Sequence, residues 1–483
     1  MSLRSVEGGQ GRSACASLLP VFAGLTAVLV AQSSCRSPVP DERVYTGRSE
    51  APRSPNTSGG VPSVPSATTG GVAPSESGGA PGTSGGIGGA DPPPGEGGSG
   101  ATAAGAGGTS GTEPPDPPSV VFTKAALLAA EADCTLGELE NFLSLAEALR
   151  DRSRELASAR STDHVDATRR AFRSAMEAWQ RLEVHRYGPA ARKGEDPAGG
   201  QDLRDQIYAW PLGGRCNVEL QLVSKGYAEP SFGTQLINVR GLGTLEYLLF
   251  NDDPNNGCPG YSPLNAQGSW AALGPAEIRA RKAEYARVVA DDVLAHASAL
   301  LAAWEGGRFR ERLTAAGSAS SPYASEQAAL NAVSNALFYV EREVKDKKLA
   351  LPLGISPDCT SGLCPESLES QYAGLSTENI RQNLRGFRQL FWGCGPRASG
   401  VGFDDWLIEV GARDLERRMA TAFDAAVLAF DQLDPPLEQA LLSKPEATNA
   451  VYQSLKRFTD LLKTEFVSAL QLELPTGTET DND

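Results

Sequence analysis

Histidine is scarce in this sequence, and the common catalytic signatures are missing from its larger part. The chain of 483 residues contains only three histidines. After residue 118 there is no G-x-S-x-G, H-E-x-x-H or P-loop pattern, and no two cysteines have the C-x-x-C spacing of a zinc site. A metallopeptidase built from these residues would lack both its Lewis acid and its activated water. The sequence therefore gives little support to an enzymatic function.

Positive charge is also in deficit. Acidic residues outnumber basic ones by 59 to 44, which gives a formal net charge of −15 and a pI near 4.9. A nucleic-acid-binding surface needs an excess of Lys and Arg to neutralise phosphates. We therefore expect no nucleic-acid partner. An acidic surface is compatible with cation binding, although it usually serves only solvation.

Long apolar runs are absent except near the N-terminus. Two arginines precede the apolar stretch ASLLPVFAGLTAVLVA at residues 16–31, and QSSC follows it and ends at Cys35. A basic start, an apolar stretch and small residues before a cleavage point are typical of a secretory signal. We expect residues 1–34 to be a signal peptide of the lipoprotein type, with Cys35 as the acylated N-terminus. The alternatives are an ordinary secretory signal and an uncleaved anchor, which would need about 20 apolar residues to span a membrane.

Aromatic and large aliphatic side chains are nearly missing from residues 35–118. The part SGGVPSVPSATTGGVAPSESGGAPGTSGGIGGADPPPGEGGSG, residues 58–100, has no aromatic residue. Such a segment cannot bury enough apolar surface to offset the entropy cost of ordering its backbone. We expect residues 35–118 to be a disordered tether that holds a folded domain clear of a membrane. Residues 476–483 form an acidic tail.

The folded part is expected to be all-α. Residues 119–475 contain amphipathic stripes with helical spacing, such as FRSAMEAWQRL at 172–182, and no run of alternating residues long enough for a strand. Clusters of Pro and Gly interrupt these stripes, which is typical of antiparallel helical bundles. The break near 306–322 is expected to divide the region into two bundles.

Six cysteines lie in this folded part, which fits an oxidising compartment. They can pair in three disulfides. Cys359 and Cys364, in DCTSGLC, are the expected local pair, and the other pairings stay open.

Four segments in order resemble the imelysin-like family, also called peptidase family M75. They are AWQRLEVHRYGP (178–189), DLRDQIYAWPL (202–212), EVKDKKLALPLG (343–354) and STENIRQNLRGFRQLFWG (376–393). The resemblance implies two antiparallel four-helix bundles, an exported location and a frequent link to iron or haem acquisition.

The signature of that family is Gly-x-His-x-x-Glu, and the segment GLGTLE resembles it with one departure. Gly241 and Glu246 match, whereas Gly243 takes the place of the histidine. An imidazole and a carboxylate three residues apart share one helix face and can grip one metal ion. Glycine offers no ligand, so the peptidase activity implied by the family name does not carry over to this chain.

Two roles for Glu246 remain open at this point. As a metal ligand, it would hold a divalent ion such as iron or zinc with help from another side chain, for which His185 is the best candidate. As a structural residue, it would sit at a helix start or pair with an arginine. His296 is expected to be a core or edge histidine, and His164 an exposed one near a helix start.

The function expected from the sequence is that of an exported, non-enzymatic binding protein in iron or haem acquisition. It would lie in the periplasm or at the outer membrane as a lipoprotein anchored through Cys35, or else be secreted. A metallopeptidase that uses other metal ligands is one alternative. A scaffold that binds an envelope protein partner and no small ligand is the other.

Overall fold

The computed structural model describes residues 122–210, 214–395, 399–475 and 478. All of them belong to one unit of the chain, Gly108–Asp483. The expected signal peptide, Cys35, the tether and, apart from Thr478, the acidic tail lie outside the described residues. Helices make up most of the described part, which contains no strand, so the all-α prediction is confirmed. No described helix is both long enough and apolar enough to cross a membrane.

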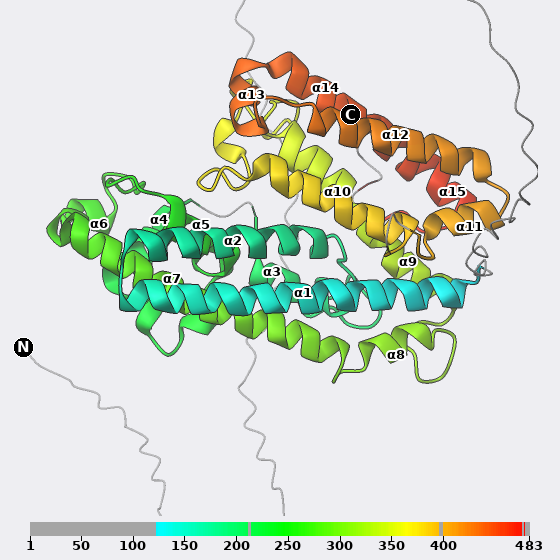
Figure 1. Cartoon of the computed structure of the whole chain (residues 1–483), viewed down its shortest axis with the longest axis horizontal. Coiled ribbons are helices and arrows are strands. Elements are labelled where there is room, and N and C mark those ends of the chain that lie inside the picture. The colour runs from blue at the N-terminus through cyan, green and yellow to red at the C-terminus, as the bar shows by residue number, and fades with distance from the viewer. Residues whose placement is uncertain (1–121, 211–213, 396–398, 476–477, 479–483) are drawn as a thin grey trace, which may run out of the picture. The chain divides into compact units, whose positions relative to one another are not determined.

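A first group of helices packs around α1 (Lys124–Ser158). α1 contacts α2 (Thr162–Leu182) and α7 (Ser269–Trp304) along much of its length, and α5 (Gly241–Phe250) packs on α7 and α2. Figure 1 shows α1, α2 and α7 running side by side. Each carries the expected apolar stripe, and their large side chains meet in the core, where the rings of Phe142 and Trp179 lie 4.9 Å apart. Shorter helices cover this group: α3 (Leu203–Ile207), α4 (Cys216–Ser224), α6 (Pro263–Ala266) and α8 (Phe309–Thr314).

A second group forms around α10 (Ser376–Trp392). It consists of α12 (Arg413–Asp431), α14 (Pro445–Leu461) and the π-helix η5 (Val340–Ala350), which follows α9 (Glu326–Leu337). The centre is aromatic, because Phe387 stacks on Phe423 and meets Phe458 edge to face. The remaining elements are α11 (Phe403–Glu409), α13 (Leu437–Ser443), the π-helix η7 (Leu462–Phe466) and α15 (Val467–Leu470).

The two groups meet where α10 crosses α2. Gly386 makes the approach possible, since a Cβ there would lie 2.3 Å from the carbonyl oxygen of Arg181. A disulfide between Cys134 in α1 and Cys394 just after α10 joins the same two groups covalently.

The structure contains two further disulfides among the described residues. They join Cys216 to Cys258 and Cys359 to Cys364, and the second of these is the expected local pair.

Candidate functional site

A cavity of about 440 Å³ opens beside α5. Three parts of the chain line it: residues from 208–210 and 214–218 around the start of α4, residues 243–247 of α5, and residues 366–372, which precede α10. The third part, which we call the 366–372 wall, comes from a long connection between η5 and α10. The lining side chains are mostly aromatic or polar: Tyr208, Trp210, Arg215, Thr244, Glu246, Tyr247, Glu366, Ser367, Ser370, Gln371 and Tyr372.

The first glycine of the motif positions α5. Gly241 begins the helix with a φ of +73°, a backbone conformation that favours glycine. A Cβ at this residue would also lie 2.7 Å from the carbonyl oxygen of Ile207, at the end of α3. Glycine therefore lets α5 start against α3, and this placement directs Glu246 into the cavity. Gly243 is also part of the cavity lining.

Glu246 joins α5 to the 366–372 wall. Its Oε1 accepts hydrogen bonds from the backbone N–H groups of Tyr372 and Ala373, both at 3.0 Å, and Ser370 donates from its side chain. Burial raises the pKa of Glu246 to about 7, although these three hydrogen bonds oppose the rise. Glu246 is the sixth of ten residues in α5 and forms no ion pair with any described arginine. The explanations by a helix start or by an arginine partner are therefore wrong.

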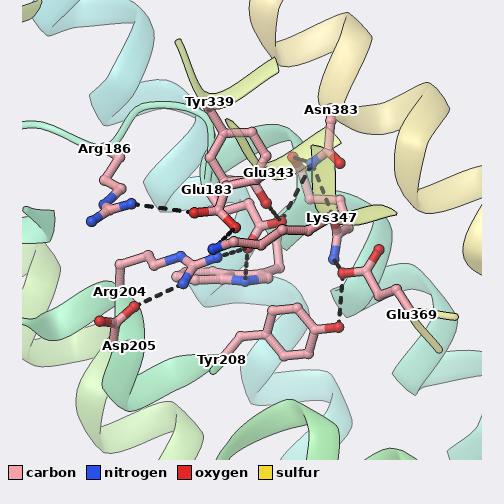
Figure 2. A network of polar contacts seen from close by, with 12 residues as sticks. Glu183, Arg186, Arg204, Asp205, Tyr208, Tyr339, Glu343, Lys347, Glu369 and Asn383 are labelled. Carbon is pink, nitrogen blue, oxygen red and sulfur yellow. Dashed lines mark hydrogen bonds and ion pairs between the residues drawn. The ribbon is translucent and has the colours of Figure 1, made fainter. Parts of the chain in front are cut away.

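A buried polar network holds Glu369, a residue of the 366–372 wall that does not itself line the cavity (Figure 2). Glu369 is its link to the wall. The Tyr208 hydroxyl donates to Glu369 at 2.8 Å, Gln180 of α2 donates to it at 3.1 Å, and the Lys348 ammonium lies 3.0 Å from its other oxygen. Both Glu369 and Lys348 are almost fully buried. The wall is thereby tied to α2 and η5.

Glu183, at the C-terminal end of α2, is the second carboxylate of this network. Arg204 of α3 and Lys348 of η5 each lie 3.2 Å from it. It also accepts hydrogen bonds from the Trp179 indole and the Tyr339 hydroxyl. Each buried charge thus has an opposite charge and additional hydrogen bonds, which is the condition for such charges to be tolerated in a core.

His185 lies outside the Glu246 cavity. It is 1 % exposed and lines a separate cavity of about 10 Å³ with Glu183 and Arg204. Its Nδ1 is 2.8 Å from the Thr135 hydroxyl, whereas Nε2 has no hydrogen-bond partner among the described residues. Burial lowers its pKa to about 3, so the ring is neutral. The structure therefore does not bring His185 and Glu246 together in one cavity.

The other two histidines, and three arginines along α10, have ordinary surroundings. His296 is partly buried beside Asp292, as expected for an edge histidine, and His164 is half-buried near the start of α2. Three arginines on one stripe of α10 pair with acidic neighbours: Arg381 with Asp431, Arg385 with Glu378, and Arg388 with Asp424.

The donor set around Glu246 does not fit a tightly held transition metal. Within the described ranges no group of three or more His, Cys, Asp and Glu side chains is close enough to hold an ion. The motif position that would carry an imidazole is Gly243, and Oε1 of Glu246 already accepts two backbone hydrogen bonds. Neutral imidazoles and thiolates, which suit zinc and iron, are missing from the described residues that line the cavity.

Sequence reasoning missed the polar network. Glu183 and Lys348 both lie within segments that carried the family resemblance, but their charges look like ordinary surface charges in the sequence. One signal was present: Lys348 is followed by the apolar run LALPL, an unusual neighbour for a solvated lysine.

The comparisons with known proteins agree with this architecture. The imelysin family model, peptidase M75, matches residues 136–464. The fold is similar to the crystal structure of an iron-regulated protein A precursor from Parabacteroides distasonis ATCC 8503, with 15 % identity and a TM-score of 0.55 over 73 % of this chain and 97 % of that one. It is also similar to an imelysin-like protein from Psychrobacter arcticum 273-4, with 15 % identity and a TM-score of 0.52 over 72 % and 96 %. None of the curated proteins matches the chain.

Proposed function

This chain belongs to the imelysin family, and we propose that it is a non-enzymatic binding protein that holds a small organic ligand in the cavity beside Glu246. The observation that carries this proposal is the cavity itself. Its volume of about 440 Å³ is typical of small-molecule sites, and its lining combines aromatic rings with polar side chains that can orient a ligand.

The rigidity of the cavity walls supports binding. The backbone N–H groups of the 366–372 wall are held by Glu246, and its Glu369 is held by Tyr208, Gln180 and Lys348. A site whose walls are already fixed loses little conformational entropy when a ligand enters. The network is therefore a means of pre-organising the cavity.

The donor set argues for an organic ligand and against the two alternatives. A metallopeptidase would need a metal held by ligands that the Glu246 cavity does not offer. A pure protein scaffold would have no use for a pre-organised cavity of this size. A role in iron or haem acquisition is supported by the family and by the name of one structural neighbour, which is described as iron-regulated.

Export and anchoring complete the proposal. The protein would act in the periplasm or at the outer membrane, held there by acylation of Cys35. Cys35→Ala should release it from membranes to the soluble fraction. Wild-type protein that is already soluble and begins at another residue would contradict the anchor.

Ligand-observed NMR with a library of small organic fragments tests the binding function. Wild type should give hits, and Ser367→Trp, which places an indole at the cavity lining, should lose them. Leu442→Trp is the control, because Leu442 is 64 % exposed on α13 and does not line the cavity. Absence of fragment hits, or hits that survive in Ser367→Trp, would contradict the proposal.

A further inference from the structure

The charges and rings around the cavity specify a class of ligand. Resting on the proposed function, we infer that the cavity binds an organic cation, a primary or quaternary amine whose charged group faces Glu246 and whose apolar part lies against the tyrosine rings. Three features point to this class of ligand: the charge of Glu246, the balance of the other charges, and the geometry of the rings.

Glu246 is a carboxylate whose partners are all neutral. The groups that donate to it are two backbone N–H groups, of Tyr372 and Ala373, and the Ser370 hydroxyl. Burial raises the pKa of Glu246, and another carboxylate, Glu369, acts on it electrostatically and contributes to the rise. The ammonium group of Lys348 already forms ion pairs with Glu369 and Glu183. Among the described residues, therefore, no cation forms an ion pair with the carboxylate of Glu246.

The other charged side chains leave the cavity negative. Arg215 is the cationic side chain of the lining, and it lies 3.6 Å from Glu219 and 3.5 Å from Asp253, so two carboxylates already surround one guanidinium. Glu366 is exposed at the cavity and forms no ion pair with a described residue. Glu246, whose pKa is about 7, is partly ionised at neutral pH, and a cation bound beside it would favour the ionised form. Such a cation would be attracted by Glu246 and Glu366, whereas an anion would have to compete with the acidic partners of Arg215.

The aromatic walls suit an alkylammonium group. The hydroxyls of Tyr208 and Tyr247 donate to Glu369 and Glu219 outside the cavity lining, which fixes both rings. The Tyr247 and Tyr372 rings are nearly perpendicular, at 82° with centroids 5.4 Å apart. Lys282 shows that the Tyr247 ring accepts a cation, since its ammonium lies 4.8 Å from the ring centroid. Aromatic rings set at an angle to one another can enclose an organic ammonium ion.

Two pairs of probes that differ in charge but little in shape test the inference. The first pair is choline and its uncharged isostere 3,3-dimethylbutan-1-ol. The second is tyramine and 4-propylphenol. Isothermal titration of the wild-type protein should show at least one amine binding tenfold or more tightly than its neutral partner. Glu246→Gln should remove that preference, while Glu366→Gln at the more exposed position should reduce amine affinity only about twofold.

The outcomes separate this inference from the proposed function. Equal affinity for the charged and neutral member of both pairs, or no amine binding while the fragment screen yields neutral or anionic hits, would overturn the cationic ligand and leave the binding function standing. Absence of any fragment hit would overturn both. Circular dichroism and thermal unfolding must first show that Glu246→Gln is folded. If it is not, Ser367→Trp replaces it, and amine binding that persists in Ser367→Trp would overturn the inference.

Discussion

At the scale of single residues, Lys348 is the cation on which the wall of the cavity depends. Its side chain is 2 % exposed and faces two buried carboxylates, Glu183 and Glu369. Removing one partner from a buried ion pair is costly because the remaining charge loses its compensation. Glu183 would keep Arg204, but no ion pair of Glu369 other than that with Lys348 is found among the described residues.

We expect Lys348→Met to lower the free energy of unfolding by about 3–5 kcal/mol. The neighbouring Lys347→Met is the matched control. Its side chain is 44 % exposed and its ammonium pairs with Glu343, so its loss should cost less than about 1 kcal/mol. Urea unfolding followed by circular dichroism measures both. Equal losses in the two variants would show that the network does not hold the fold.

His185 makes stability depend on pH. Its pKa is lowered to about 3 by burial, whereas in the unfolded chain it has its ordinary value of about 6.5. On acidification the unfolded chain therefore takes up the proton first. The stability that the neutral ring provides is fully present above about pH 6.5 and is lost as pH falls toward 3, by up to about 1.4 kcal/mol per pH unit.

The measurement compares wild type with His185→Gln in urea unfolding at a series of pH values. Below about pH 6.5 the free energy of unfolding of wild type should fall more steeply than that of the variant. Parallel curves would mean that His185 takes up a proton equally in the folded and unfolded states.

The sequence located Glu246 but could not explain it. Comparison with the family signature was enough to single out Gly241, Gly243 and Glu246. The backbone N–H groups that donate to Glu246 lie 126 and 127 residues further along the chain, and nothing in the local sequence pattern indicates them. Side-chain roles that depend on such distant contacts cannot be read from spacing.

At the scale of elements, the crossing of α2 and α10 depends on one glycine. Gly386→Ala places a Cβ 2.3 Å from the carbonyl oxygen of Arg181, so the helices must move apart. We expect a net loss of about 1–3 kcal/mol in the free energy of unfolding. Gly137→Ala in α1 is the control, since its Cβ meets nothing within 4 Å, and it should stabilise the protein by up to about 1 kcal/mol. Stabilisation by both changes would contradict the close approach.

The helices themselves were largely predictable, because their apolar stripes repeat at helical spacing. The change from α-helix to π-helix and the break between two helices were not predictable. The segment VEREVKDKKLA follows α9 but adopts the π-helix η5, and α11 and α12 are separated near Gly411, where φ is +83°. Such changes follow from packing against neighbouring helices, which a single-segment pattern does not contain.

At the scale of the whole molecule, the disulfides differ in what they constrain. Cys134–Cys394 closes a loop with a sequence separation of 260, whereas Cys359–Cys364 spans only 5. In the loop-entropy description, removing the first should cost about 5 kcal/mol and removing the second about 2 kcal/mol. Unfolding of the two double-serine variants measures the difference. A larger loss for the local pair would contradict the entropic ranking.

Only one of these disulfide pairs could be predicted from the sequence. The local pair follows from proximity along the chain. The partner of Cys134 could not be named, because the pairing depends on how α10 lies beside α1 and α2. The cavity is a product of the same long-range arrangement, since its three linings are far apart in the sequence.

We propose that the Glu246 site accommodates a small organic ligand and does not hold a transition metal tightly. Calorimetric titration of zinc and iron(II) into wild type, Glu246→Ala and Gly243→His tests it most directly. We predict no submicromolar metal binding by wild type. Restoring the imidazole in Gly243→His should raise affinity by tenfold or more, as gaining a ligand should. Submicromolar binding by wild type that disappears in Glu246→Ala would contradict the claim and make this protein a metalloprotein.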